Sequence, residues 1–184
     1  MLDVDRLIAD CRDAAAVSGS PGVLEVVARA VATPVEVLKG LGEPQRAAVQ
    51  VLHRSAEITV FNLIWGPRMC QLPHNHGMWA VIGIYTGRED NIFWRRPPGA
   101  PGGRIEAAGA RALSERDAVP LGPQLIHSVV NPIKRLTGAI HVYGGDFFAV
   151  PRSEWDPEHL VEGPYDVAKT LALFEESNRL YPPA

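Results

Sequence analysis

The chain has 184 residues, of which 46% are hydrophobic and 21% charged, and its formal net charge is −3 at pH 7. This length is sufficient for one domain with a full core, and the slight negative charge gives no electrostatic basis for binding nucleic acid or an anionic membrane. The two cysteines form no CxxC pair, and we see neither an apolar leader nor a membrane-spanning run, so we expect a cytoplasmic protein without disulfides.

The first part of the chain predicts helices. Leu7, Ile8, Cys11 and Ala15 recur at helical spacing. Ser20-Pro21 combines an N-cap residue with a proline in the first turn. Thr33-Pro34 repeats this signal for a short third helix that ends near Gly40. Residues 1–47 are therefore expected to form a helical segment.

Strands are expected from about residue 48, where runs rich in Val, Ile, Phe, Trp and Tyr alternate with glycine and proline clusters. The expected strands are 57–65, 78–86, 90–96, 104–108, 125–130 and 137–143. Helix signals return at Asp156-Pro157 and from Asp166 to Leu180. Many short strands predict a mainly β sandwich or barrel over 48–184 with a C-terminal helix. The helices of 1–47 would pack on it, so that the whole chain forms one domain.

Three histidines form a candidate metal site. His74 and His76 are two positions apart and would share one face of a strand. His127 lies in a later expected strand, after a turn at Pro120 and Gly122. Each histidine alone is more readily explained as structural, but together they predict a single mononuclear metal ion bound by His74, His76 and His127.

The full pattern G-x7-H-x-H…G…P-x-G-x4-H-x3-N resembles the two motifs of the cupin superfamily over roughly residues 57–150. The resemblance implies a double-stranded β-helix (jelly-roll) barrel with a metal inside it. Many cupins have a glutamate ligand where this chain has Ala80. Cupins with three histidines and no glutamate include the thiol dioxygenases, namely cysteine dioxygenase and 3-mercaptopropionate dioxygenase. The implied cofactor is one Fe(II), whose open positions can accept a thiolate.

A second segment extends the resemblance to thiol dioxygenases. The family carries a Ser-x-His-x-Tyr strand, and residues 139–143 read Ala-Ile-His-Val-Tyr. The resemblance implies that Tyr143, held by His141, hydrogen-bonds the substrate or oxygen at the metal. Ala139 departs from the family serine and removes one hydroxyl group from this arrangement.

Candidate residues for binding a substrate carboxylate lie on both sides of these motifs. Arg152 matches an arginine nine residues after the tyrosine in bacterial 3-mercaptopropionate dioxygenases, and its planar fork suits a carboxylate. The alternative for Arg152 is a solvated residue before the C-terminal helix. Gln50 aligns with the upstream carboxylate-binding position, but the alignment needs a gap, so His53 and Arg54 are alternatives.

Glu89 and Asp146 are expected to be surface charges. The implied activity is oxidation of a small carboxylate-bearing thiol, of the cysteine or 3-mercaptopropionate type, to its sulfinic acid by an iron-dependent enzyme. Two alternatives keep the metal: a cupin dioxygenase acting on a substrate other than a thiol, and a non-catalytic metal-binding sensor. The expected partners are the small thiol and O2, with neither nucleic acid nor a membrane, and the chain is expected to be a monomer or a homodimer.

Overall fold

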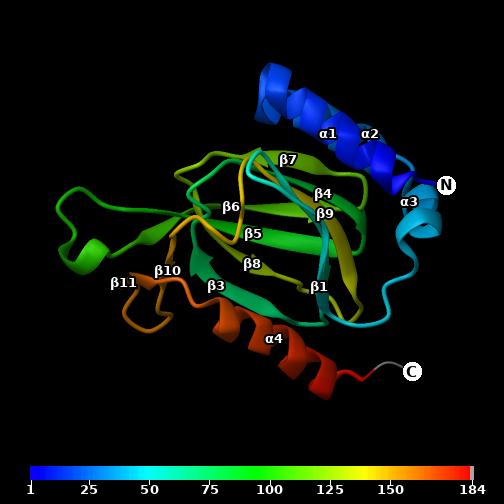
Figure 1. Ribbon diagram of the computed structural model, residues 1–184. Helices are drawn as coiled ribbons and strands as arrows, with labels where there is room; N and C mark the ends of the chain where they lie inside the picture. The colour runs from blue at the N-terminus through cyan, green and yellow to red at the C-terminus, as the bar shows by residue number, and fades with distance from the viewer. Residues whose placement is uncertain (183–184) are drawn as a thin grey trace.

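The computed structural model describes residues 1–182 and shows two antiparallel sheets that face each other (Figure 1). The first sheet has the order β1-β2-β9-β4-β7 and the second the order β11-β10-β3-β8-β5-β6. The strands of the first sheet are β1 (Ala48–Arg54), β2 (Thr59–Trp65), β4 (Ala80–Thr86), β7 (Ala118–Leu121) and β9 (Thr137–Tyr143). Those of the second are β3 (Cys70–His74), β5 (Arg88–Arg95), β6 (Glu106–Ser114), β8 (Ile126–Val130), β10 (Ser153–Trp155) and β11 (Glu162–Pro164).

The strand pairing is that of a jelly roll. Moving inward along the chain from both ends of the barrel, β2 pairs with β9, β3 with β8, β4 with β7 and β5 with β6. Successive pairs alternate between the two sheets, as when one long hairpin is wrapped into a barrel. The predicted mainly β, double-stranded β-helix fold with N-terminal helices and a C-terminal helix is confirmed.

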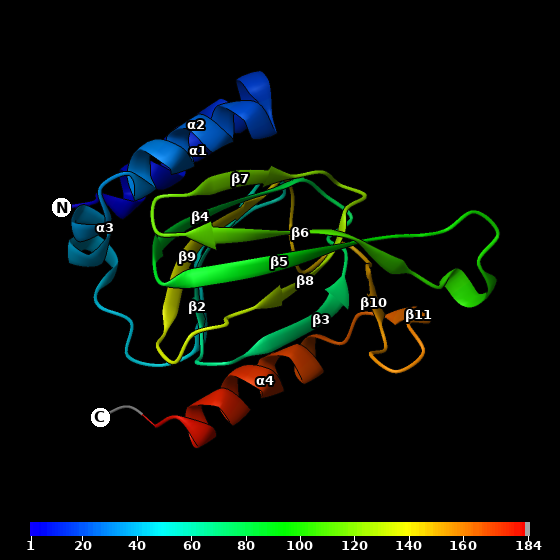
Figure 2. The same cartoon turned by 180° about the vertical axis from the view of Figure 1, so that it is seen from behind.

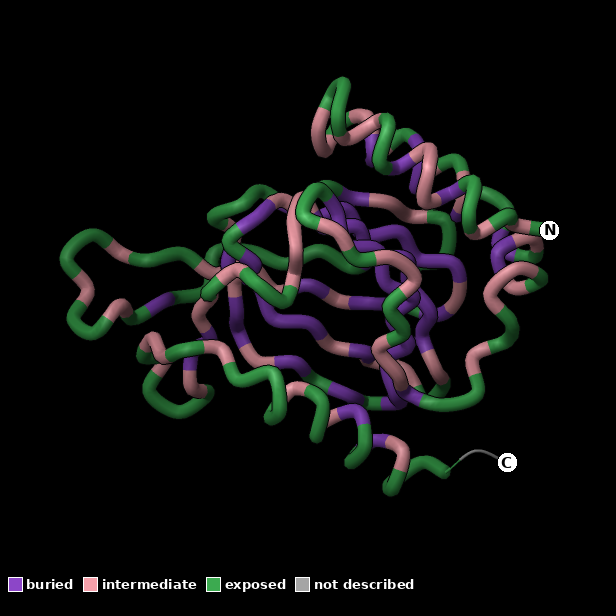
Figure 3. Tube along the Cα trace, in the orientation of Figure 1, coloured by how far each residue is buried: buried purple, intermediate pink, exposed green. Residues whose placement is uncertain are grey.

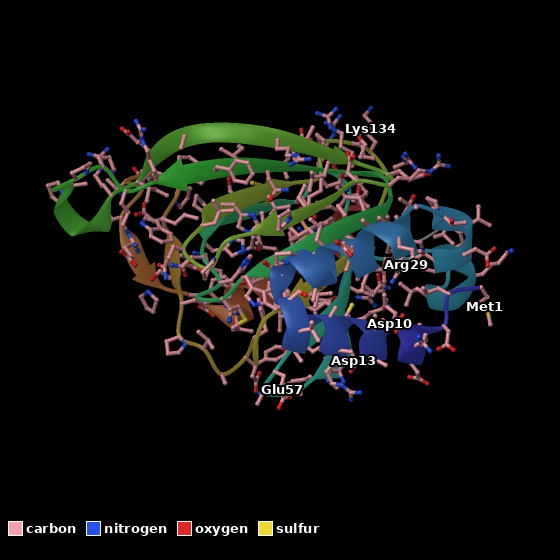
Figure 4. All side chains as sticks on the ribbon, turned by 90° about the horizontal axis from the view of Figure 1, so that it is seen from above. Met1, Asp10, Asp13, Arg29, Glu57 and Lys134 are labelled. Carbon is pink, nitrogen blue, oxygen red and sulfur yellow. The ribbon has the colours of Figure 1, made fainter. Side chains whose placement is uncertain are left out.

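Three helices cover the outer face of the first sheet: α1 (Val4–Ser18), α2 (Ser20–Val31) and α3 (Pro34–Leu41), seen from above in Figure 4 with Asp10 and Asp13 on α1 and Arg29 on α2. Val23, Val27 and Val31 of α2 are fully buried in the layer between helices and sheet. Gly83 of β4 allows this close approach, because a Cβ there would lie 2.4 Å from the Val27 side chain.

The C-terminal helix α4 (Val167–Leu180) lies along β3, on the opposite side of the barrel from α1 and α2 (Figure 2). Its Asn178 side chain accepts a hydrogen bond from the Ala47 backbone N–H (2.8 Å) and donates one to the Ala47 carbonyl (3.0 Å). Phe174 stacks on Trp65, with ring centroids 5.5 Å apart. These contacts fix α4 against the barrel, where it contributes to the interior cavity described below.

Burial follows the two layers: the strand segments that face each other are buried, whereas the loop between β5 and β6, which contains the short 3-10 helix η1 (Pro101–Gly103), is largely exposed (Figure 3).

The prediction of a helix start at Asp156-Pro157 was wrong. The Asp156 carboxylate accepts backbone N–H groups of Glu158, His159 and Val161, and this closes a turn instead. Within residues 1–182, none of the helices has the length and apolar character needed to cross a membrane.

Candidate metal centre

The fold brings the three predicted histidines together inside the barrel. His74 is the last residue of β3 and lies opposite His127 of β8 in the strand pairing. The prediction that His74 and His76 share a strand was wrong, because β3 ends at His74. His76 lies in the connection to β4, just before Gly77, whose positive φ of 67° turns the chain. The His76 ring still points inward, with its centroid 5.0 Å from that of His74 and 4.9 Å from that of His127.

The Nε2 atoms of the three rings converge. His76 Nε2 lies 3.2 Å from His74 Nε2 and 3.2 Å from His127 Nε2, and all three rings are buried. With metal–nitrogen bonds of about 2.0–2.1 Å, neighbouring ligand atoms in a tetrahedral site lie roughly 3 Å apart. His74, His76 and His127 therefore form a group with the spacing to hold one metal ion.

The rings are also in the protonation state that metal binding requires. Burial lowers the pKa of His74 to about 4. Burial, followed by the neighbouring histidines, lowers the pKa values of His76 and His127 well below the usual value. All three are consequently neutral at neutral pH, so each imidazole has a free lone pair available to a cation.

Hydrogen bonds on the far side of two rings determine which nitrogen carries that lone pair. His74 Nδ1 lies 2.8 Å from the Leu72 carbonyl, and His127 Nδ1 lies 2.6 Å from Asn91 Oδ1. Both partners are acceptors only, so Nδ1 must carry the proton in each ring. The Nε2 lone pairs then point toward the common centre, as in metal-binding histidines generally. The donor set thus fits a single metal ion on its own geometry.

His141 and Tyr143 lie beside the three histidines on β9. Tyr143 packs edge-on against His76 with centroids 5.0 Å apart, and its hydroxyl lies 3.1 Å from His141 Nδ1. Burial raises the pKa of Tyr143 far above its usual value. The phenol therefore keeps its proton and can act as a hydrogen-bond donor within the barrel.

Arg152 follows β9 and reaches the same cavity. Its guanidinium carbon lies 3.9 Å from the ring centroid of Phe147 and 4.3 Å from that of Tyr165, and Nη1 donates to the Phe147 carbonyl. Nε and Nη2 are buried, and neither finds a hydrogen-bond partner among residues 1–182. Two adjacent N–H groups of a planar guanidinium are a fork that matches a carboxylate. The alternative of a solvated Arg152 does not fit this burial.

All these groups line one small cavity of about 60 Å³, which has room for a few water molecules or a small ligand. One wall comes from α4 through Val167, Thr170, Leu171 and Phe174. The rest of the lining is Val49, Phe61, Leu63, Trp65, Gln71, His74, His76, His127, Val129, His141, Tyr143, Phe147, Phe148, Arg152 and Tyr165. No aspartate or glutamate is among these lining residues, so Arg152 makes the cavity a cationic and otherwise largely apolar site.

Gln50 is not part of the cavity, and its predicted role in binding a carboxylate was wrong. It is exposed, and its Oε1 accepts from Asn62 Nδ2 (2.8 Å), its cross-strand partner. Successive residues of a strand face opposite ways, so Val49 lines the cavity instead. Of the two alternatives, His53 does not line the cavity either. Arg54 does not line it either, since its guanidinium pairs with Asp146 and lies 4.8 Å from the ring centroid of Phe148.

The sequence analysis missed Glu89, which was expected at the surface but is fully buried. It also missed Asn91, the partner of His127, and Tyr165, which stacks on Arg152. Glu89 and Asn91 are two positions apart, and β5 begins at Arg88 rather than at the expected residue 90. Extending that strand by two residues would have placed both side chains on its inward face.

Comparisons with known proteins were made at the level of families and of structures. No family model matches the chain. A DMSP lyase from Ruegeria pomeroyi is similar at 18% identity and a TM-score of 0.46, over 61% of this chain and 53% of that one. An RmlC-like cupin family protein from Methanocaldococcus jannaschii with a double-stranded β-helix fold is similar at 9% identity and a TM-score of 0.45, over 58% of this chain and 86% of that one.

Oxalate decarboxylase from Bacillus subtilis is also similar, at 17% identity and a TM-score of 0.41, over 52% of this chain. This chain spans only 23% of the length of that decarboxylase. Identities of 9% to 18% do not assign an activity to this chain. Its function has to be inferred from the site itself.

Proposed function

We propose that the chain is an iron-dependent thiol dioxygenase that converts a small carboxylate-bearing thiol and O2 into the sulfinic acid. Both oxygen atoms are added to sulfur, and the electrons that sulfur loses reduce the dioxygen, so the reaction needs no other reductant. The observation that carries the proposal is the combination in one cavity of three converging neutral histidines, a protonated tyrosine and an arginine with two unpartnered N–H groups.

The three-histidine donor set suits this chemistry. Imidazole ligands suit iron, and a set with no carboxylate leaves a divalent ion its full charge for an anionic ligand such as a thiolate. Bound iron(II) would supply a coordination site at which the thiol loses its proton and dioxygen reacts. His74, His76 and His127 would hold it through their Nε2 atoms.

Arg152 would bind the substrate carboxylate. Its Nε and Nη2 need acceptors, and a carboxylate supplies two oxygen atoms with matching spacing. The rings of Phe147 and Tyr165 hold the guanidinium plane between them, so the fork is already oriented before the substrate arrives. A carboxylate fixed there would set how far the thiol at the other end can reach toward the histidines.

Tyr143 would donate its hydroxyl proton in a hydrogen bond to the substrate or to oxygen. Its raised pKa keeps the hydroxyl protonated, and His141 Nδ1 lies within hydrogen-bond distance of that hydroxyl. The apolar side chains of Phe61, Leu63 and Val129 line the same cavity, and surroundings of such low polarity would strengthen this hydrogen bond.

The test combines elemental analysis of purified protein with oxygen uptake after anaerobic loading with Fe(II). The panel should contain 3-mercaptopropionate, cysteine, cysteamine and propionate, so that the thiol and the carboxylate are varied separately. We expect uptake of one O2 per thiol consumed, with the carboxylate-bearing thiols reacting fastest. A fully iron-loaded protein that consumes no oxygen with any thiol would refute the proposal. Oxygen uptake with propionate but with none of the thiols would favour a dioxygenase acting on a substrate other than a thiol. Tight ligand binding without turnover would favour a sensor.

A further inference from the structure

Glu89 is a buried carboxylate whose position requires an explanation. Its exposed fraction is 0%. Oε2 accepts a hydrogen bond from Trp65 Nε1 (2.7 Å), and Oε1 accepts one from Asn91 Nδ2 (2.9 Å). No lysine or arginine within residues 1–182 forms an ion pair with it. Burying a carboxylate without a cation costs several kcal/mol in general, so this placement implies a compensating role.

One side of Glu89 leads to a predicted metal ligand. An ionised carboxylate can only accept hydrogen bonds, so Asn91 must turn its NH2 group toward Glu89. The amide oxygen of Asn91 then faces His127 Nδ1 at 2.6 Å and can only accept a proton from it. Glu89 thereby fixes the orientation of Asn91. Asn91 in turn fixes the tautomer in which His127 Nε2 presents its lone pair to the metal centre.

The other side of Glu89 leads to the tyrosine. His141 Nε2 lies 3.5 Å from Glu89 Oε2 and is buried with no hydrogen-bond partner in the described part of the chain. Ala139, two residues earlier on β9, has no polar side-chain atom to occupy that position. A proton on His141 Nε2 would face Glu89 Oε2, and this contact would fix the plane of the ring and with it the position of Nδ1, which lies 3.1 Å from the Tyr143 hydroxyl. The carboxylate thus orients the imidazole ring that holds Tyr143 in place.

We infer that Glu89 is a positioning residue for the whole centre, acting through Asn91 on His127 and through His141 on Tyr143. It places a carboxylate beyond the proposed metal site, whose three candidate ligands are all neutral imidazoles. A divalent cation bound there would compensate the burial of Glu89. The inference rests on the metal site of the proposed function and does not depend on thiol oxidation.

The test is the affinity of the protein for Fe(II) alone, measured anaerobically by competition with a chromophoric chelator. Glu89→Gln keeps the size of the side chain and removes its charge, and its new amide no longer dictates the orientation of Asn91. We expect about 10- to 100-fold weaker Fe(II) binding, the range found for partners of metal-binding histidines. Asp90→Asn is the matched control, because Asp90 is a neighbouring carboxylate that pairs with Arg88 at the surface, and it should bind Fe(II) within about twofold of wild type.

Thermal unfolding of the metal-free proteins separates positioning from a structural role. A structural role would lower the unfolding midpoint of metal-free Glu89→Gln and leave Fe(II) affinity unchanged, and that result would overturn the inference. If Glu89→Gln does not fold, Asn91→Ala provides the second test, since it cuts the link to His127 while Glu89 remains. It should weaken Fe(II) binding by a similar factor, and binding within twofold of wild type would overturn the inference.

The two proposals can fail separately. A wild-type protein that binds Fe(II) tightly without oxidising thiols would refute the proposed activity, and the effect of Glu89→Gln on affinity could still be measured. Wild-type thiol oxidation together with unchanged affinity in both variants would refute only the role of Glu89. The tyrosine side has its own measurement: Glu89→Gln saturated with Fe(II) should show a lowered kcat at unchanged KM, because Tyr143 loses its support while Arg152 does not.

Discussion

Replacing Arg152 by methionine should separate substrate binding from stability. Methionine has a similar length and can occupy the space between the rings of Phe147 and Tyr165, but it cannot bind a carboxylate. We expect a large loss of kcat/KM toward carboxylate-bearing thiols and little change in the free energy of unfolding of the ligand-free protein. Both expectations follow from the contacts of the Arg152 guanidinium, which needs a carboxylate partner but has none in the ligand-free protein.

The magnitudes can be worked from those contacts. Removing one partner of a buried, hydrogen-bonded charge pair costs about 2–5 kcal/mol, which at about 1.4 kcal/mol per decade is a loss of at least about 30-fold in kcat/KM. In the free protein Arg152 gains its ring contacts and one hydrogen bond. It also buries two nitrogen atoms, Nε and Nη2, without a hydrogen-bond partner, each at a cost of about 1–3 kcal/mol. These contributions nearly cancel, so we expect a stability change within about 1 kcal/mol.

The assay is steady-state oxygen uptake with 3-mercaptopropionate and with 2-mercaptoethanol, which carries a hydroxyl in place of the carboxylate, together with urea unfolding of the ligand-free protein. The loss for Arg152→Met should appear with the acid and be absent with the alcohol. Arg152→Lys keeps the charge without the planar fork and should fall between wild type and Arg152→Met. An equal loss on both thiols would show that Arg152 maintains the site as a whole, and the reasoning above would be refuted.

Three further predictions concern Tyr143, the pH dependence of stability and the anchoring of α4. Tyr143→Phe should retain a full equivalent of metal by elemental analysis but lower kcat in the oxygen assay, because the hydroxyl donor is lost; loss of metal would contradict this. His74, with a pKa lowered by burial to about 4, binds a proton in the unfolded chain below about pH 6.5 before it does so in the folded one. Stability of the metal-free protein is therefore expected to be complete above that pH and to decline toward pH 4. Urea unfolding at pH 7, 5.5 and 4.5 measures this, and a constant stability would refute it. Phe174→Ala should cost about 3–5 kcal/mol in urea unfolding, whereas Leu171→Ala, on the same helix but 48% exposed, should cost less than about 1 kcal/mol; equal costs would mean that α4 is not anchored through Phe174.

The helices were predictable from sequence because their signals are local. Pro21 lies in the first turn of α2, as expected, but the N-cap is Gly19 and the predicted cap residue Ser20 is the first residue of the helix. Thr33 is the N-cap of α3, and Pro34 is its first residue. Strand β3 was expected only from the spacing of His74 and His76, and nothing else in Cys70–His74 predicts a strand, since the segment contains a proline and lacks β-branched residues. Its strand character comes from pairing with β8, more than fifty positions later in the chain, and such long-range contacts leave no local pattern.

The site was predictable to the extent that it depends on residue type and spacing. His74, His76, His127, His141, Tyr143 and Arg152 all line the cavity. The prediction for Gln50 was wrong because the alignment that selected it needs a gap, which leaves the register of the strand undetermined. A shift of one residue exchanges the two faces of a strand. The structure places Val49 on the inner face and Gln50 on the outer one.

The prediction that Glu89 is a surface charge was wrong for a different reason. A glutamate is almost always exposed unless it is paired, so composition alone predicts a surface charge. What buries it is contributed by other strands: Trp65 of β2 donates to it, and β5 lies next to β8, which carries His127. A motif defined by metal ligands finds no carboxylate here, because Ala80 occupies the expected position. Glu89 instead lies on β5 and is joined to His127 through the hydrogen bonds of Asn91, so its place in the barrel depends on how the strands pack and not on the spacing of the histidines.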